Sequence, residues 1–478
     1  MPDRPNILLI HTDQQRWDAL GANGNPDIKT PNLDRLAATG LNFDHYFVQN
    51  AVCMPSRVSM LSGQYPATLG IMQNGVPVPE DTVTLPRLLQ NCGYRSANIG
   101  KLHFLPHANR DHRQIHPDYG FDHLEISDEP GCYEDAYRAW VRWKASGQLD
   151  SISVGLPPAA HAWYEAMGII DPVKHPTTTG GGARFDFAGA IPFAADEALT
   201  HSAFVADRTI EFLRQQGNCP FLCVAGFYSP HAPWVVPQRY LSMYDPREFS
   251  LPEFPPGLQS QRDEDIFSED GLRRARHGYY AMITEVDHYV GSILNALDEF
   301  GFADNTIVIF TSDHGEWLGE HLKYGKGYPA HDCISRVPFI IRWPGRITEP
   351  GTTIGGMVEA VDVLPTLLEC AGIPIPPQLQ GRSFARVLHE DGGGSLQWVP
   401  RESALTEMSG WKTLRLPGFR YVVRVTGDEQ LFDLASDPAG YRNVATDTVY
   451  QEVLGLARQQ LITHMIERER PLLRQWPY

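Results

Sequence analysis

A short segment near residue 53 combines a reactive side chain with the start of a helix. It reads C-M-P-S-R over residues 53–57 and continues to L-S-G over residues 61–63. Pro55 is typical of the first turn of a helix, and Arg57 then lies one turn past Cys53 on the same helical face. Taken alone, Cys53 is most simply interpreted as a buried cysteine before a helix, so its function depends on the residues that accompany it.

Two acidic residues and a histidine follow apolar segments that read as buried strands. Asp13 lies just past the apolar run of residues 6–11, and Asp313 and His314 lie just past residues 306–311. A lone Asp after a strand is more often a turn former or a helix cap. Two such acids at the ends of sheet strands can, however, converge on one cation. Carboxylate oxygens suit calcium, magnesium or manganese.

Lys101 and His103 form a possible anion-binding pair. They lie in the sequence G-K-L-H. On a strand their side chains would share one face, because side chains alternate along a strand. An exposed pair without function fits the pattern equally well, so the pair gains meaning only together with the other candidates.

Two loops carry further basic residues that could act on an anionic ester. His231 lies between two prolines, straight after the apolar residues 221–227, and Lys326 lies in the sequence Y-G-K-G. Prolines on both sides would hold the His231 loop rigid. Lys323 is a competing candidate for the role of Lys326, and His321 is interpreted as structural.

The pattern C-x-P-S-R followed by L-S-G is the signature of the formylglycine-dependent sulfatases of the alkaline phosphatase superfamily. The chain resembles this family from about residue 4 to about residue 445. The resemblance implies that Cys53 is oxidised to formylglycine and lies beside one divalent metal ion, calcium or manganese. The implied metal-binding residues are Asp13, Cys53, Asp313 and His314. The implied catalytic residues are Cys53, Arg57, Lys101, His103, His231 and Lys326.

The resemblance also implies a mechanism. A hydroxyl of the hydrated aldehyde attacks sulfur in line with the departing alcohol, while Lys101 and Lys326 hold the anionic oxygens. Arg57 hydrogen-bonds the nucleophile and the metal ligands. His231, with Lys326, donates a proton to the leaving oxygen, and His103 then takes a proton from the second hydroxyl.

Two positions depart from the pattern of many family members. Gln14 and His314 stand where those members carry Asp and Asn. The Gln and His variants are similar to the branch that includes phosphonate monoester hydrolases and choline sulfatases. An imidazole ligand makes manganese plausible beside calcium. Whether Gln14 binds the metal stays open.

We therefore expect a hydrolase of sulfate monoesters, similar to arylsulfatases, that acts on a small anionic ester and is matured by a formylglycine-generating enzyme. The alternative is a phosphonate monoester hydrolase or phosphodiesterase that uses the same site, with promiscuity between these classes. A non-catalytic anion- or metal-binding relative is disfavoured, because the nucleophile, the acids, both lysines and both histidines are all present.

Composition excludes some partners. The net charge of -17 argues against nucleic acid, because phosphate binding needs clustered Lys and Arg. No apolar stretch is long enough to span a membrane, and no secretory signal is recognised at the N-terminus.

The seven cysteines are scattered and odd in number, which favours a reducing compartment and a cytoplasmic location. Cys219 and Cys223 are interpreted as core residues. The apolar residues 472–478 are expected to pack on the body or on another subunit, so a homo-oligomer is possible.

Apolar segments alternate with helical patterns, which predicts an α/β fold. Such alternation is typical of a large, mostly parallel or mixed sheet flanked by helices, where ligands bind at the carboxyl ends of the strands. The expected strands are residues 6–11, 221–227, 306–311 and 338–342. The expected helices are residues 30–39, 83–92, 202–216 and 273–300.

The catalytic α/β domain is expected to span residues 1–371, with a long excursion over the active site at about residues 105–199. This excursion is rich in Gly, Pro, His and aromatic residues. Its histidines at positions 107, 112 and 116 could line the pocket, although a solvated loop is the more probable interpretation for each. A C-terminal subdomain of residues 372–478 is expected, with antiparallel segments at 413–416, 420–425 and 429–434 and a helix at 451–468.

Overall fold

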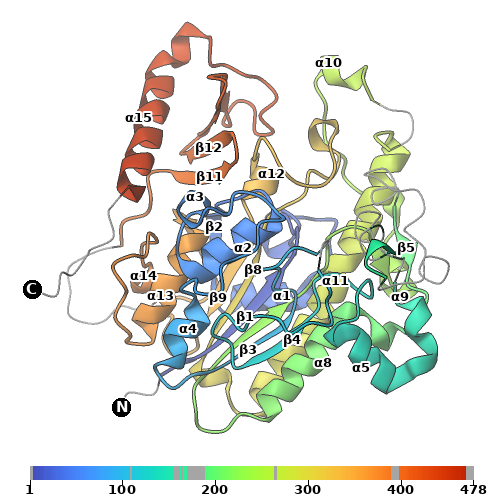
Figure 1. Cartoon of the computed structure of the whole chain (residues 1–478). Coiled ribbons are helices and arrows are strands. Elements are labelled where there is room, and N and C mark those ends of the chain that lie inside the picture. The colour runs from blue at the N-terminus through green and yellow to red at the C-terminus, as the bar shows by residue number, and fades with distance from the viewer. Residues whose placement is uncertain are drawn as a thin grey trace, which may run out of the picture.

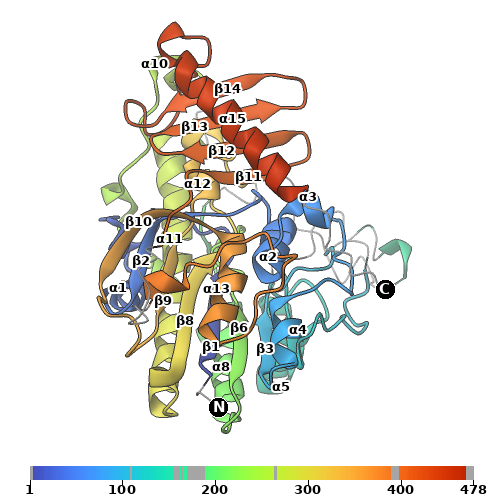
Figure 2. The same cartoon turned by 90° about the vertical axis from the view of Figure 1, so that its left-hand side faces the viewer.

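An eight-stranded sheet forms the centre of the computed structural model, which describes residues 4–107, 110–153, 155, 162, 165–168, 189–262, 266–388 and 398–469. The strand order is β10-β2-β9-β8-β1-β6-β3-β4 (Figures 1 and 2). The strands are β1 (Asn6–Thr12), β2 (Leu41–Phe47), β3 (Arg95–Gly100), β4 (His123–Ile126), β6 (Phe221–Gly226), β8 (Thr306–Ser312), β9 (Phe339–Arg342) and β10 (Thr352–Glu359).

Strand β9 runs against its neighbours in an otherwise parallel sheet. It pairs antiparallel with β8 and β2, whereas β1, β6, β3, β4 and β8 form parallel pairs, as do β2 and β10. The predicted α/β class and mostly parallel or mixed sheet are confirmed. The sequence reasoning missed β2, whose residues Asn42, Asp44 and His45 interrupt any apolar run.

Helices cover both faces of the sheet, because its strands are apolar on both sides. Ile7 and Leu9 of β1 join one core, and Leu8 and Ile10 join the other. The first core packs on α2 (Cys53–Ser62), α4 (Leu85–Gln90), α13 (Val363–Cys370) and α14 (Ala385–Leu388). The second packs on α1 (Pro31–Ala38), α5 (Ala136–Ala145), α8 (His201–Arg214) and α11 (Glu269–Glu299). Shorter elements are α3 (Pro66–Leu69), β5 (Ile191–Pro192), β7 (Val235–Val236), α9 (Gln238–Leu241), α10 (Pro256–Gln259) and α12 (Asp332–Ser335).

A second, antiparallel sheet follows near the C-terminus. Its strands are β11 (Ala404–Met408), β12 (Trp411–Leu416), β13 (Phe419–Arg424) and β14 (Glu429–Asp433), paired in sequence order. Figure 2 shows α15 (Gln451–Arg468) lying across this sheet, where Leu454 and Leu461 pack against Leu405 and Leu414. The predicted sheet and terminal helix are confirmed, with β11 as an additional strand.

The excursion is only partly described. Helix α5 lies within it. The glycines at 180–182 and the apolar residues 472–478 lie outside the described residues. Of the two cysteines interpreted as core residues, Cys223 is buried and Cys219 is exposed, because Cys219 precedes β6 rather than lying in it. None of the helices in the described ranges is long and apolar enough to cross a membrane.

A buried polar cluster joins the two sheets. Arg401 donates to Asp362 over 2.7 Å and lies 3.0 Å from the Glu359 carboxylate at the end of β10. Glu359 also accepts from the backbone N–H of Leu405 in β11. All three charged side chains are buried, so each carboxylate depends on Arg401 for its counter-charge.

We predict that Arg401→Met lowers the free energy of unfolding by about 3 kcal/mol or more, because it leaves two buried carboxylates without their counter-charge. The measurement is urea unfolding followed by tryptophan fluorescence. Arg247→Met is the matched control, since the Arg247 side chain is 87% exposed and its ion pair with Asp245 lies at the surface. Equal destabilisation by the two substitutions would contradict the prediction.

Candidate active site

The predicted site residues meet at the carboxyl end of the central sheet. Asp13 follows β1, Asp313 and His314 follow β8, and Lys101 follows β3. Cys53 begins α2, which the chain enters after β2. Because these strands run parallel, their carboxyl ends bring residues from distant parts of the sequence to one edge.

Cys53 lies at the centre of this group and is 1% exposed. Its Sγ is 2.8 Å from the Lys326 Nζ, 3.2 Å from the His314 Nε2 and 3.8 Å from an Asp13 oxygen. Burial raises the pKa of the thiol, as does Asp13, but the charges of Lys326 and Lys101, together with the neighbouring His314 ring, lower it overall. The sulfur marks where the side-chain oxygens of an oxidised residue 53 would lie.

Asp13, Cys53, Asp313 and His314 form a compact set of donor atoms. Their ligating atoms all lie within 4.8 Å of one another, and all four residues are buried. The His314 Nδ1 is 2.9 Å from the Gly315 carbonyl oxygen, so Nδ1 carries the proton and donates. The Nε2 lone pair is thereby directed at the cluster, which is how imidazole ligands of metals are commonly oriented. Two carboxylates, an imidazole and residue 53 fit a divalent cation.

Two buried basic side chains hold these carboxylates in place. Arg57 donates to an Asp313 oxygen over 2.7 Å and also to the backbone oxygen of Lys101 over 3.0 Å. The Lys101 Nζ is 2.7 Å from an Asp13 oxygen. Burial opposes the ionisation of Asp13, but the charge of Lys101 above all holds its pKa well below the usual range. Burial likewise opposes the ionisation of Asp313, but the charge of Arg57 above all lowers its pKa.

The placement of Lys101 and His103 on a strand was wrong. Strand β3 ends at Gly100, which has a φ of 89°, and His103 has a φ of 54°. A Cβ at Gly100 would lie 2.1 Å from the Gly226 backbone oxygen, so the two strands approach too closely there for a side chain. The chain then turns, and the buried Asp128 carboxylate accepts from the backbone N–H groups of Leu102 and His103 over 3.0 and 2.8 Å.

The excursion supplies contacts to His103. The rings of His103 and His107 lie 3.7 Å apart, and the ring of His112 stacks on Tyr133 at 3.8 Å. The solvated-loop interpretation is therefore wrong for His107 and His112, which are partly buried; His116 is also partly buried and bonds the Pro117 oxygen. Burial, His107 and Lys101 hold the pKa of His103 well below its usual value, so its imidazole is neutral.

His231 and Lys326 lie together above Cys53. The Lys326 Nζ is 2.8 Å from the His231 Nε2, while the His231 Nδ1 contacts the Tyr228 hydroxyl and the Ala232 carbonyl oxygen. Burial and the adjacent Lys326 charge hold the pKa of His231 well below its usual value. The competitor Lys323 lies elsewhere, with its Nζ 4.7 Å from the Trp317 ring centre.

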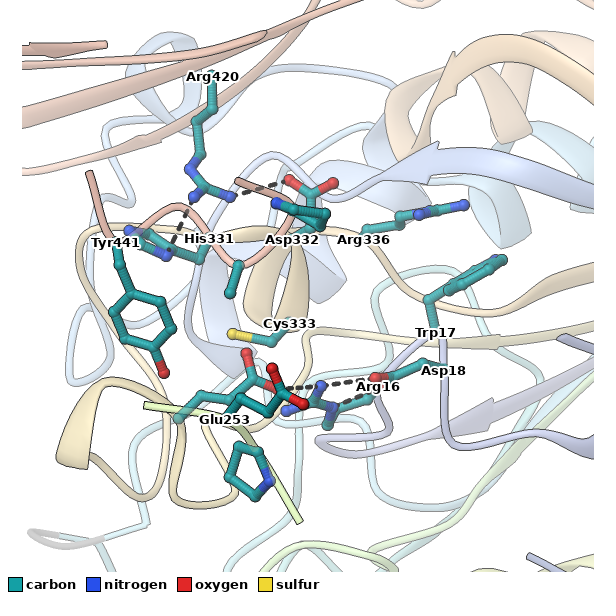
Figure 3. Close-up of a pocket in the computed structure, with 14 residues that line it drawn as sticks. Arg16, Trp17, Asp18, Glu253, His331, Asp332, Cys333, Arg336, Arg420 and Tyr441 are labelled. Atoms are coloured by element: carbon teal, nitrogen blue, oxygen red, sulfur yellow. Dashed lines mark hydrogen bonds and ion pairs between the residues drawn. The ribbon is translucent and has the colours of Figure 1, made fainter. Parts of the chain in front are cut away.

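A separate pocket of about 340 Å³ lies between the loop after β8 and the C-terminal sheet (Figure 3). Its guanidinium groups are already paired: Arg420 donates to Asp332 and to the His331 ring, and Arg16 contacts Glu320 and Asp18. His321, interpreted as structural, bonds the Ala439 carbonyl oxygen near this pocket. These contacts brace the loop that carries Lys326.

Sequence reasoning overlooked two buried carboxylates beside the site. Asp128 orients the residues around His103 but lies 25 residues away in sequence, so no local pattern marks it. Glu316 follows His314 by two positions and accepts from the Gln14 side chain. Its place in the run D-H-G-E directly after β8 was a signal that could have found it.

Known proteins are similar to this chain over nearly its whole length. An arylsulfatase from Clostridium perfringens is 30% identical over 489 aligned residues, which cover 98% of this chain and 95% of the relative. A multifunctional alkaline phosphatase superfamily protein from Trinickia caryophylli is 29% identical, with 94% of this chain and 92% of the relative covered. The solved structure of a phosphonate monoester hydrolase from Agrobacterium radiobacter superposes with a TM-score of 0.78 at 27% identity and covers 97% of this chain and 96% of that one.

Two family profiles together match most of the chain. A profile described as N-sulphoglucosamine sulphohydrolase, C-terminal, matches residues 319–467. The profile of the sulfatases matches residues 5–373, which include the cysteine motif and both strand-end aspartates. Together with the arylsulfatase likeness, this match shows that the chain belongs to the sulfatase family, within the alkaline phosphatase superfamily, as its cysteine motif predicted.

Proposed function

We propose that this protein hydrolyses sulfate monoesters and that Cys53, after oxidation to formylglycine, carries the nucleophile. The observation that carries the proposal is the environment of Cys53, whose sulfur lies 2.8 Å from the Lys326 ammonium and 3.2 Å from the His314 ring. A cysteine in this position faces charges suited to an anionic ester. The hydrated aldehyde of formylglycine would supply one hydroxyl to attack sulfur and a second to release the product.

One divalent cation, calcium or manganese, fits the donor set of Asp13, Asp313, His314 and the modified residue 53. It would supply positive charge that favours ionisation of a hydroxyl group at residue 53. Arg57 fixes the Asp313 carboxylate, and Lys101 fixes that of Asp13. The protein thereby keeps both carboxylates in the geometry that a cation requires.

The remaining side chains divide the binding of the ester and the movement of protons. Lys101 and Lys326 bind the non-bridging oxygens of the ester and stabilise their charge. Lys326 also donates to His231, which places a proton source beside the departing alcohol. His103 is assigned the role of accepting a proton from residue 53, as the family resemblance implies.

Maturation requires a partner, a formylglycine-generating enzyme. Cys53 is 1% exposed and every residue of α2 is buried. An enzyme that oxidises this cysteine cannot reach it in the folded protein, so the reaction would take place before residues 53–62 pack onto the sheet.

The second candidate function is hydrolysis of phosphonate monoesters and phosphodiesters at the same site. The observation that favours it is the likeness to the Agrobacterium radiobacter phosphonate monoester hydrolase and to the multifunctional Trinickia caryophylli relative. These esters and sulfate monoesters each carry one negative charge on a tetrahedral centre. Since charge does not separate them, we propose that the enzyme is promiscuous between the classes.

Cys53→Ala should lower kcat for an aryl sulfate by about three orders of magnitude or more, because covalent catalysis disappears. The matched control is Cys223→Ala, which removes another buried thiol, from β6, and should keep wild-type activity. Mass spectrometry of the tryptic peptide 36–57 should show an aldehyde in place of the thiol in the wild type. Activity of Cys53→Ala within tenfold of wild type would rule out this mechanism.

Metal analysis tests the cation site directly. Elemental analysis of the wild type should find about one divalent cation per chain, and Asp313→Asn should retain much less, because an amide oxygen lacks the carboxylate charge. Asp287→Asn is the control, since it changes a buried carboxylate that instead accepts from the backbone of Leu33. Unchanged metal content in Asp313→Asn would remove Asp313 from the site.

Substrate breadth can be ranked with one shared leaving group, p-nitrophenol. We expect measurable kcat/KM for the sulfate monoester, the phosphonate monoester and the phosphodiester, and a lower value for the phosphate monoester. A phosphate monoester carries nearly two negative charges at neutral pH, which this site is not arranged to receive. Fastest hydrolysis of the phosphate monoester would contradict the charge argument.

A further inference from the structure

Glu316 is a fully buried carboxylate that joins three segments around the site. It lies two residues after His314 and is 0% exposed. One of its oxygens accepts from the Gln14 side-chain nitrogen. The other accepts from the backbone N–H groups of Leu318, over 3.0 Å, and Gly325. A single side chain thus connects the loop after β1 with both ends of the turn that precedes Lys326.

Gln14 is tightly constrained by its surroundings. It has a φ of 71°, its N–H donates to an Asp313 oxygen over 3.0 Å, and its carbonyl oxygen accepts from the Tyr279 hydroxyl over 2.7 Å. Only the nitrogen of its amide can donate to Glu316, so the contact decides which way the amide faces. The amide oxygen, Oε1, is buried and has no hydrogen-bond partner within the described part of the chain.

The second contact of Glu316 bears on Lys326. Gly325 is held on both sides, because its N–H donates to Glu316 and its carbonyl oxygen accepts from the Trp317 N–H over 3.0 Å. Lys326 follows directly, and its Nζ lies 2.8 Å from both the Cys53 sulfur and the His231 Nε2. Loss of the Gly325 contact would free the backbone from which this lysine reaches Cys53.

We propose that Glu316 is a positioning residue: its carboxylate turns the oxygen of the Gln14 amide toward the cation cluster and fixes the backbone that presents Lys326 to Cys53. This inference rests on the proposed function of the cluster and of Lys326. Glu316 itself donates nothing to the substrate. It acts by accepting hydrogen bonds that set the geometry of two residues that face the reaction.

Exchanging the side chains at positions 14 and 316 distinguishes a role in hydrogen bonding from a role in packing alone. In Glu316→Gln, the new side-chain oxygen can still accept from Leu318 and Gly325, but the new amide nitrogen meets the nitrogen of Gln14. Two donors cannot bond, so the Gln14 amide must turn over and present its NH2 group to the cation. In the reciprocal variant Gln14→Glu/Glu316→Gln, a donor and an acceptor face each other again, with the total charge of the wild type.

The experiment measures the effect of Glu316→Gln in two backgrounds, with Gln and with Glu at position 14. The readouts are the dissociation constants of calcium and manganese, from competition with a chelator, and kcat and KM for an aryl sulfate. With Gln at position 14, Glu316→Gln should weaken cation binding by about 10- to 100-fold and lower kcat. With Glu at position 14, the same substitution should have little effect or the opposite effect. Each comparison keeps position 14 constant, so the direct attraction of an added carboxylate for the cation cancels.

Glu285→Gln is the matched control, because it changes another fully buried carboxylate, on α11, away from the cluster. It should leave cation affinity unchanged. Equal effects of Glu316→Gln in the two backgrounds, or wild-type cation affinity in Glu316→Gln, would overturn the inference alone. A wild type that binds the cation without hydrolysing any ester would overturn only the proposed function, and absence of cation binding in every variant would overturn both.

Discussion

Charge balance among buried side chains is the constraint on which the rest of the structure depends. Asp13 and Asp313 are completely buried, and burial of an unpaired carboxylate costs several kcal/mol. Arg57 and Lys101 offset this cost through contacts of 2.7 Å with Asp313 and Asp13. The fold must therefore bring all four side chains into contact with one another. Parallel strands provide that convergence, because their carboxyl ends share one edge of the sheet.

The C-terminal sheet supports the active site through ion pairs that lie outside it. Arg415 and Arg420 contact the two oxygens of Asp332 at 3.1 and 3.2 Å, at the end of the loop that carries Lys326. That loop has no regular backbone pairing with the central sheet in the described residues, so its position depends on side-chain contacts. The small sheet is thus part of the support of the active site, although its own strands hold none of the proposed catalytic residues.

Local patterns made much of the site predictable. A cysteine before a helix and acids just past apolar runs each have a signature within a few residues, and the structure brings Asp13, Cys53 and Asp313 together. The turn at Gly100 was not predictable, because it arises from close approach to Gly226, far away in sequence. The direction of β9 was equally hidden, since a short apolar run reads the same in a parallel or an antiparallel pair.

Because the protein has a net charge of -17, its binding of an anionic ester depends on the positive charges placed within the site. An anionic ester is repelled by an acidic surface, but at physiological ionic strength such repulsion fades over about 8 Å. The partly buried Lys326 ammonium, 2.8 Å from the Cys53 sulfur, is screened less than surface groups, so attraction takes over once the ester enters the site. A protein can therefore remain acidic outside and bind an anion within, provided that its positive charges lie where they are shielded from bulk solvent.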